Sequence, residues 1–405
     1  MQIAVLFASL LATASIAAYG QTVDSSVGGA YVASVLSAMN AANLTAFVNA
    51  AQAVANTTEG DACLAAINQT YSYDRTLFAP TNEAFAKVSE SVSSNTTLLA
   101  NILSYHLLDL PVEIRRSKSG GFLSRTGHSL YNNGLLPGNE GQLLVMAAMN
   151  TTQTGNLSLV FPYQKNNETV YGSTSPVPGT NFTVYPIDAV LTLPQPLNEA
   201  ATTFFPSLAG IVQQAGLLEP LIKSKGITVL APNDDAISAV SALFGTLNST
   251  QLQAVLMNHV INGTVAYSTP LGDTLNYTSA GGEPLKFLVK ATGAYVTSGE
   301  TTARILHVDI PIANGVVHII DRVLTNSNSN TAAAESAASS YAVQATATSS
   351  GAGSSPTMGS ATGAASGAAT SAKASTAMLS VPFSSGVVGS VVAIFVGIFA
   401  GATLS

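Results

Sequence analysis

Eleven asparagines stand in the pattern Asn-x-Ser/Thr, the spacing in this sequence that most directly predicts a chemical reaction. The tripeptide accepts an N-linked glycan in the secretory pathway, where the acceptor asparagine must lie at the surface. No such tripeptide follows residue 326, although Ser and Thr are abundant there. The set therefore predicts glycosylation of the folded region. The candidate acceptors are Asn43, Asn56, Asn68, Asn95, Asn150, Asn156, Asn167, Asn181, Asn248, Asn262 and Asn276.

The five histidines show no spacing typical of a metal site or of a base beside a nucleophile. His307 and His318 are eleven residues apart across a predicted hairpin. The sequence also lacks Gly-x-Ser-x-Gly, His-Glu-x-x-His and a phosphate-binding glycine loop. We interpret His106 and His259 as core histidines bonded to the backbone, because each lies inside an apolar run. No catalytic residue, metal or cofactor is expected.

The carboxylates do not form an acid–base pair at a recognisable spacing. Asp234 and Asp235 are adjacent at a predicted helix start, where acidic side chains cap helices. Asp188 and Asp321 lie in predicted closing strands, where each is expected to fix a turn or a helix end. We therefore predict that the protein is not an enzyme.

Composition argues against a nucleic-acid-binding protein and against a fold held by disulfides within the chain. The 405 residues carry 14 Lys and Arg against 21 Asp and Glu, a net charge of −7, so no nucleic acid partner is expected. Cys63 is the only cysteine, which rules out a disulfide within the chain. We expect Cys63 to be buried as a small apolar residue, with an intermolecular disulfide as the alternative.

Both ends of the sequence are typical of a membrane-attached secretory protein. Residues 1–20 combine an apolar run with small residues before Gln21 and predict a signal peptide. Residues 386–405 are apolar and uncharged and follow a Ser/Thr/Ala/Gly-rich segment, the order of a glycosylphosphatidylinositol (GPI) anchor signal. Residues 327–385 are too poor in large apolar side chains to form a core, and we predict a disordered stalk there.

The intervening sequence contains the same three motifs twice, in the same order. TLFAPTNEAFAKV at 76–88 corresponds to ITVLAPNDDAISAV at 227–240, each predicting a buried strand, an Ala-Pro stop and a capped helix. The second motif surrounds His106 in one copy and His259 in the other, and predicts a helix running into a strand. The third predicts a closing strand, at 184–191 and 318–324. Tandem copies of one domain explain this order.

The second copy also contains Asn314-Gly315, a hairpin-turn signal between predicted strands 305–310 and 316–324. The first copy lacks this turn and is longer: 82 residues separate His106 from Asp188, against 62 between His259 and Asp321. The additional residues fall in the Gly/Asn-rich stretch 117–180, which we expect to be surface loop.

The combination TLFAPTNEAF, Tyr-His and NGVVHIIDRVL resembles the fasciclin family. The resemblance covers 29–195 and 198–326 as two tandem domains. It implies an α+β fold in which each domain is a β-sandwich wrapped by helices. Asn258 departs from the pattern, because it stands where the family motif has Tyr.

The family resemblance also implies candidate adhesion contacts. In animal fasciclin proteins, an Asp-Ile pair before the Asn-Gly turn and the Tyr-His region have been proposed as integrin contacts. Asp309 and Ile310 match the first, and Tyr105 and His106 match the second. The apolar neighbours of these residues indicate packing as the alternative role.

From these features we expect a GPI-anchored adhesion or matrix glycoprotein at the plasma membrane or cell wall. Its expected partners are cell-wall polysaccharide, matrix or surface proteins, or further copies of itself, and it meets the membrane through its lipid anchor. The alternative is a membrane-tethered fasciclin protein of the vacuole or secretory pathway that acts in membrane fusion or trafficking.

Overall fold

The computed structural model describes residues 37, 39–55, 57, 58, 60, 75–109, 124–150, 157–164, 170–172, 182–268, 276–290 and 293–351. The predicted signal peptide at 1–20, Cys63, most of the predicted stalk and the predicted anchor signal at 386–405 lie outside these residues. Within the described ranges, no helix is both long enough and apolar enough to cross a membrane.

The two halves of the chain build the same seven-stranded sheet. In domain 1 the strand order is β2-β1-β7-β6-β5-β4-β3, and in domain 2 it is β9-β8-β14-β13-β12-β11-β10. The strands of domain 1 are β1 (Arg75–Pro80), β2 (Leu107–Leu108), β3 (Ser124–His128), β4 (Leu143–Asn150), β5 (Leu157–Phe161), β6 (Val170–Gly172) and β7 (Phe182–Ile187). Those of domain 2 are β8 (Ile227–Pro232), β9 (Val260–Asn262), β10 (Asn276–Thr278), β11 (Pro284–Lys290), β12 (Gly293–Ser298), β13 (Thr301–Ile312) and β14 (Gly315–Ile320).

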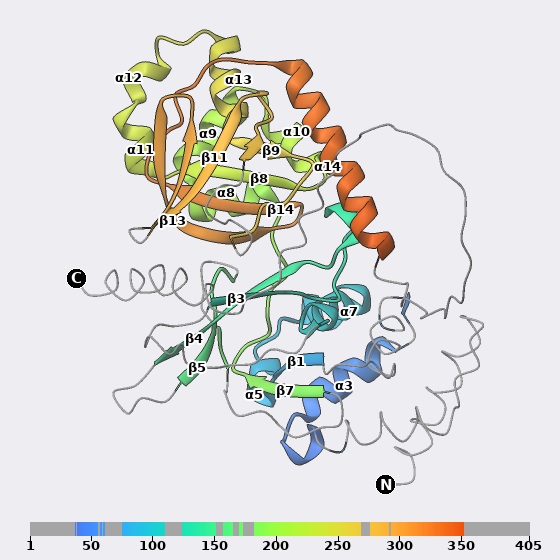
Figure 1. Cartoon of the computed structure of the whole chain (residues 1–405). Helices are drawn as coiled ribbons and strands as arrows, with labels where there is room; N and C mark the ends of the chain where they lie inside the picture. The colour runs from blue at the N-terminus through green and yellow to red at the C-terminus, as the bar shows by residue number, and fades with distance from the viewer. Residues whose placement is uncertain are drawn as a thin grey trace, which may run out of the picture.

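Helices cover one face of each sheet (Figure 1). They are α3 (Thr45–Val54), α5 (Asn82–Phe85), α6 (Glu90–Ser93) and α7 (Thr96–Tyr105) in domain 1. Domain 2 has α8 (Leu197–Phe204), α9 (Pro206–Gln214), α10 (Leu218–Lys223), α11 (Asp234–Ala239), α12 (Ser241–Phe244) and α13 (Ser249–Met257).

The repeated motifs occupy equivalent positions, as predicted. The Ala-Pro strand of each copy pairs in parallel with the closing strand, β1 with β7 and β8 with β14. The chain then turns into a helix whose first N–H groups are capped by Thr81 in one copy and by Asn233 in the other. Each cap residue also donates its backbone N–H to the end of the closing strand, at Ile187 and Ile320 (both 2.9 Å).

Successive side chains of a strand point to opposite faces of the sheet. The central strands of each domain therefore contact two separate apolar layers. In β8, Val229 and Ala231 pack under the helices. Leu230 points the other way, into a core with Phe287 and Val296 from the outer strands. Domain 1 repeats this arrangement with Leu77 and Ala79 on one side and Phe78 on the other. The predicted helix-wrapped sandwich is therefore present in both domains.

Residues 117–180 differ from our prediction of surface loop, because this stretch contributes strands β3, β4, β5 and β6. Leu144, Met146 and Phe161 from it are buried in the sandwich core of domain 1. The frequent Gly and Asn residues of the stretch obscured its period-two apolar pattern.

The predicted hairpin around Asn314-Gly315 is confirmed, with β13 and β14 antiparallel on either side. The Asn314 side chain is buried, and its Nδ2 donates to the carbonyl oxygens of Leu221 (2.7 Å) and Ser224 (2.8 Å). The turn is thereby attached to the end of α10.

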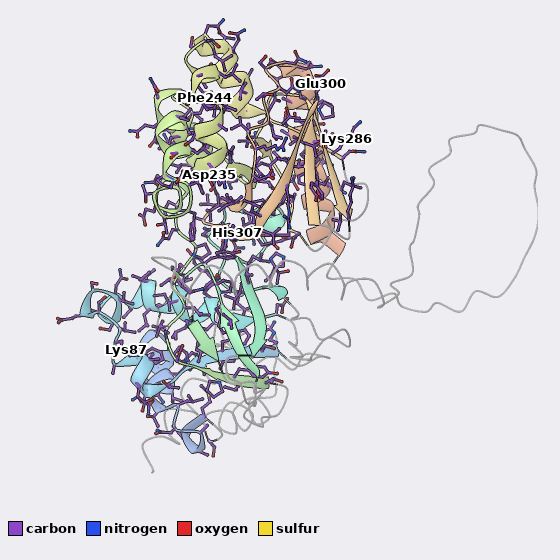
Figure 2. The ribbon with its side chains drawn as sticks, turned by 90° about the vertical axis from the view of Figure 1, so that its left-hand side faces the viewer. Lys87, Asp235, Phe244, Lys286, Glu300 and His307 are labelled. Carbon is purple, nitrogen blue, oxygen red and sulfur yellow. The ribbon has the colours of Figure 1, made fainter. Side chains whose placement is uncertain are left out.

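The two domains are in direct contact through this same turn. The Ala313 carbonyl oxygen accepts hydrogen bonds from Asn133 Nδ2 (2.7 Å) and Gln142 Nε2 (2.8 Å) of domain 1. Beside it, Gly226 N–H donates to the Leu135 carbonyl oxygen (2.9 Å). Figure 2 shows His307 of β13 at this boundary. The linkage is specific, because amide side chains from one domain saturate a backbone group of the other.

The expectation of disorder throughout 327–385 is corrected by a helix, α14 (Thr331–Gly351). It begins on domain 2 and runs alongside the helical turn Pro137–Asn139 of domain 1 (Figure 1). The Tyr341 hydroxyl accepts a hydrogen bond from Thr278 N–H (3.0 Å), and its ring packs on Tyr277. Composition alone gave no sign of this helix, although Ala favours helix. The backbone of α14 at Ala338 passes so close to Gly263 that a Cβ on Gly263 would lie 3.1 Å from the Ala338 carbonyl oxygen.

Candidate functional site: the predicted contacts and the glycan acceptors

Asp309, the first predicted contact, lies in a bulged segment of β13. The pairing of β13 with β14 shifts register on both sides of His307, and Asp309 adopts a positive φ of 57°. Its carboxylate accepts hydrogen bonds from the backbone N–H of Ser268 (2.8 Å) and from the Ser268 hydroxyl. These bonds offset the cost of the left-handed conformation, which few residues other than Gly and Asn adopt.

Ser268, Asp309 and His318 are the residue types of a hydrolase triad, but they are not connected as one. His318 Nδ1 accepts from Asp309 N–H (3.2 Å), so its Nε2 carries the proton and donates to the Ala266 carbonyl oxygen (2.8 Å). The Ser268 proton goes to the carboxylate and not to the imidazole. Both ring nitrogens are therefore occupied by backbone, and no base is available to activate the serine.

His106 and the preceding Tyr105 are core residues of domain 1. The Tyr105 hydroxyl donates to the Leu143 carbonyl oxygen (2.9 Å). His106 Nε2 accepts from Leu191 N–H (3.0 Å), which leaves Nδ1 protonated to donate to the Ile102 carbonyl oxygen (2.7 Å). The histidine thus links the last turn of α7 to the segment after β7.

His259 makes the same connection in domain 2. Its Nδ1 donates to the Val255 carbonyl oxygen (2.8 Å) and its Nε2 accepts from Leu324 N–H (2.9 Å). Burial lowers the pKa of both His106 and His259 to about 4. Each imidazole is therefore neutral at neutral pH, as its hydrogen bonds require.

The four candidate adhesion contacts are all buried. The exposed fractions are 2 % for Asp309, 1 % for Ile310, 1 % for Tyr105 and 0 % for His106. A partner cannot reach these side chains in this fold, so the structure supports the alternative reading of packing.

The Asp234 and Asp321 carboxylates accept hydrogen bonds from backbone groups, but Asn233 caps α11 in place of the predicted Asp234 or Asp235. Asp321 Oδ1 accepts from Arg304 N–H (2.7 Å), and Asp234 Oδ1 accepts from Ser207 N–H (3.3 Å) beside the capped start of α11. Among the described residues, no group of three or more His, Cys, Asp and Glu side chains is placed to hold a metal ion.

Five predicted glycan acceptors have side chains that the structure describes, and all five are exposed: Asn43, Asn95, Asn248, Asn262 and Asn276. Asn95 and Asn248 are equivalent in the two domains. Each is the N-cap of its helix, with Oδ1 accepting from Leu98 N–H (3.0 Å) and Gln251 N–H (2.9 Å). A glycan is attached at Nδ2, so capping and glycosylation use different atoms. Asn150 ends β4, and the remaining acceptors Asn56, Asn68, Asn156, Asn167 and Asn181 lie outside the described residues.

A family model decides the assignment. The fasciclin domain model matches residues 38–194 and 204–326, more than half of the chain. The chain belongs to the fasciclin family. Fasciclin domains are adhesion-type domains, and membership supports a protein of the cell surface or extracellular space.

Individual relatives match single stretches of this fasciclin chain. It is 30 % identical over 155 residues to a fasciclin-like arabinogalactan protein of Arthroderma benhamiae, covering 38 % of this chain and 35 % of that protein. It is 32 % identical over 133 residues to protein sll1483 of Synechocystis, covering 31 % and 69 %. The chain thus spans about a third of the length of its fungal relative.

Among solved structures, a fasciclin domain pair from the insect cell adhesion molecule fasciclin I aligns with 70 % of this chain and 97 % of its own. The sequence identity is 16 % and the TM-score is 0.34.

Proposed function

We propose that the protein is an adhesion glycoprotein of the cell surface, with its two fasciclin domains presented on a GPI-anchored stalk. The main support for this proposal is the pair of adhesion-type domains joined through Ala313, with exposed glycan acceptors on both. Its partners are cell-wall polysaccharide, matrix or surface proteins, or further copies of itself. Each contact is weak, and many copies on one surface raise the total strength.

Among the described residues, the group of Ser268, Asp309 and His318 offers no activated nucleophile, and this favours a binding role over a catalytic one. Ser268 donates its proton to the Asp309 carboxylate, and both ring nitrogens of His318 bind backbone groups. Low charge also fits an exposed protein whose glycans, rather than Lys and Glu, keep it in solution.

Beads coated with the purified protein test this proposal. We expect them to aggregate, or to bind isolated cell wall or matrix material, in proportion to the density of coating. Beads coated with deglycosylated protein control for contacts made by the glycans alone. Beads that neither aggregate nor bind at any density contradict adhesion, and a protein confined to internal membranes would favour the fusion or trafficking alternative.

A further inference from the structure

The outer strands of domain 2 present a basic face to solvent. In β11, Leu285 and Phe287 point into the core, whereas Lys286, Leu288 and Lys290 are exposed. Figure 2 shows Lys286 on the side of these strands away from the helices that carry Asp235 and Phe244. Among the described residues of domain 2, these helices cover one side of the sheet and the lysines lie on the other.

Strand register places an aromatic ring and a guanidinium beside the lysines. Leu288 pairs with Tyr295 of β12, and Tyr295 pairs with Arg304 of β13, so the three lie in one row across three strands. Lys286 and Lys290 flank this row on β11. We call Lys286, Leu288, Lys290, Tyr295 and Arg304 the basic sheet face. With strands about 4.8 Å apart and about 3.4 Å per residue, it measures roughly 10 by 14 Å, the size of a few linked sugars.

The cations of the basic sheet face are not neutralised within the described structure. Neither lysine nor Arg304 has a carboxylate within ion-pair distance among the described residues, whereas Arg75 pairs with Asp109 and Lys223 with Glu219. Three cations without a counter-ion favour an anionic ligand.

The nearby carboxylates are directed elsewhere. Glu283 and Glu300 lie in the turns at one end of the strands, and Glu283 accepts from Asn326 Nδ2 (3.1 Å). Asp321 uses an oxygen for Arg304 N–H (2.7 Å). The opposite end of the face, at Lys290, has no acidic residue among its strand partners.

Contacts at this end of the face bring Lys290 to the Tyr295 ring and Arg304 to Gly293. Lys290 Nζ lies 5.6 Å from the centroid of the Tyr295 ring. The Arg304 guanidinium passes over Gly293, where a Cβ would come within 3.2 Å of Nε, and this Nε is buried without a hydrogen-bond partner. The terminal nitrogens of a guanidinium beside a lysine and a ring can bind a carboxylate or phosphate with paired hydrogen bonds, while the ring and Leu288 contact the apolar side of a sugar.

We propose that the basic sheet face binds an anionic polysaccharide, a glycan chain that carries carboxylate or phosphate groups. The inference rests on the proposed adhesive function and names the chemistry of one partner. A polymer fits better than a small anion because the cations are spread along an open sheet, and each contributes a weak contact that repetition along the chain strengthens.

Binding of the purified full-length protein to immobilised polygalacturonate, phosphorylated mannan and neutral mannan tests the proposal. We expect binding to one or both acidic polymers, weakening as salt rises, and little binding to the neutral one. The carboxylate and phosphate arms identify which anion is preferred. Equal binding to neutral and acidic polymers would overturn the proposal.

Variants that remove equal charge from different surfaces test whether the basic sheet face is where the polymer binds. Lys286→Gln with Lys290→Gln should weaken binding by about ten-fold, and Tyr295→Ala should weaken it further. Lys87→Gln with Lys225→Gln removes the same charge from exposed lysines elsewhere and should leave binding unchanged. Equal losses in the two double variants would show a nonspecific charge effect and overturn the assignment.

Two further arms separate the alternatives. Asn276 pairs with Lys286 at the edge of the face, so a glycan there could cover it; the Asn276→Gln protein should bind at least as tightly.

Vesicles containing anionic lipid replace the polymer in the other arm, and binding to vesicles but not to polymer refutes the proposal. If the protein passes the bead test but binds neither acidic polymer, the role proposed for the basic sheet face is wrong and the proposed adhesive function is unaffected.

Discussion

His259 Nε2 accepts a 2.9 Å hydrogen bond from the backbone N–H of Leu324, 65 residues further along the chain. His106 and Leu191 form the same bond in domain 1 at 3.0 Å. Each imidazole joins the end of a helix to the segment that follows the closing strand. The histidine of the second motif therefore connects these two parts of each domain through hydrogen bonds.

Replacing this histidine should destabilise its domain. In His259→Ala, Leu324 N–H loses its partner and a buried ring leaves a cavity, at a cost of about 2–4 kcal/mol in the free energy of unfolding. Chemical denaturation monitored by tyrosine fluorescence measures the change, with exposed Lys87→Ala as control. Equal unfolding midpoints for the two variants would contradict the role we assign to His259.

Acidification should destabilise both domains within a defined window. The pKa of His106 and His259 is about 4 in the folded protein against an ordinary 6.5, so between these values the unfolded chain binds more protons. The histidine contribution is constant above pH 6.5 and is lost as pH falls toward 4, by about 1.4 kcal/mol per pKa unit for each group. Urea midpoints at pH 7, 5.5 and 4.5 should fall accordingly, and less steeply in a His106→Asn/His259→Asn variant. Parallel curves for wild type and variant would refute this.

Helix α14 should depend on Tyr341. Its ring packs on Tyr277 and its hydroxyl accepts from Thr278 N–H, so Tyr341→Ala removes about 1–2 kcal/mol of attachment. Proteolysis within residues 331–351 should then accelerate about ten-fold. Val343→Ala, at a side chain 68 % exposed on the same helix, should leave the cleavage rate unchanged. Cleavage of wild type as fast as Tyr341→Ala would mean that the helix is not docked.

The contact between the domains should depend on two amides. Asn133→Ala with Gln142→Ala leaves the Ala313 carbonyl oxygen without either donor. We expect a broader distribution of interdomain distances by fluorescence energy transfer between labels on the two domains. Asn132→Ala, whose side chain bonds only within its own loop, is the control. A distribution unchanged by the double substitution would show that the Gly226–Leu135 bond and the contact of α14 with Pro137–Asn139 are enough to fix the domains.

Glycosylation and capping should be separable at Asn248. Asn248→Asp removes the glycan and keeps a capping oxygen, so the protein should lose the mass of one glycan with little change in stability. Asn248→Ala removes both and should cost about 1 kcal/mol more. Mass spectrometry and thermal unfolding measure the two effects, and Asn95 allows the same comparison in domain 1. A mass unchanged by Asn248→Asp would show that this acceptor is unused.

The sequence predicted the elements that local pattern defines. The Ala-Pro strand ends, the capped helices that follow them, the core histidines and the Asn314 turn were all predicted, because each depends on neighbouring residues. The contact of Asn133 with Ala313 was not, since it joins residues 180 positions apart. Helix α14 was missed because composition alone does not show that Tyr341 has a docking site. The basic sheet face was also missed, although PLKFLVK at 284–290 alternates as an exposed strand does.

The central claim is adhesion from the cell surface, and one measurement on intact cells tests it most directly. Cells producing the protein with an epitope after Gln21 are allowed to adhere to wall-coated surfaces before and after treatment with phosphatidylinositol-specific phospholipase C. We predict that the epitope appears in the medium and that adhesion falls in proportion to its release. Complete release with undiminished adhesion would contradict the account, as would an epitope that stays inside the cell.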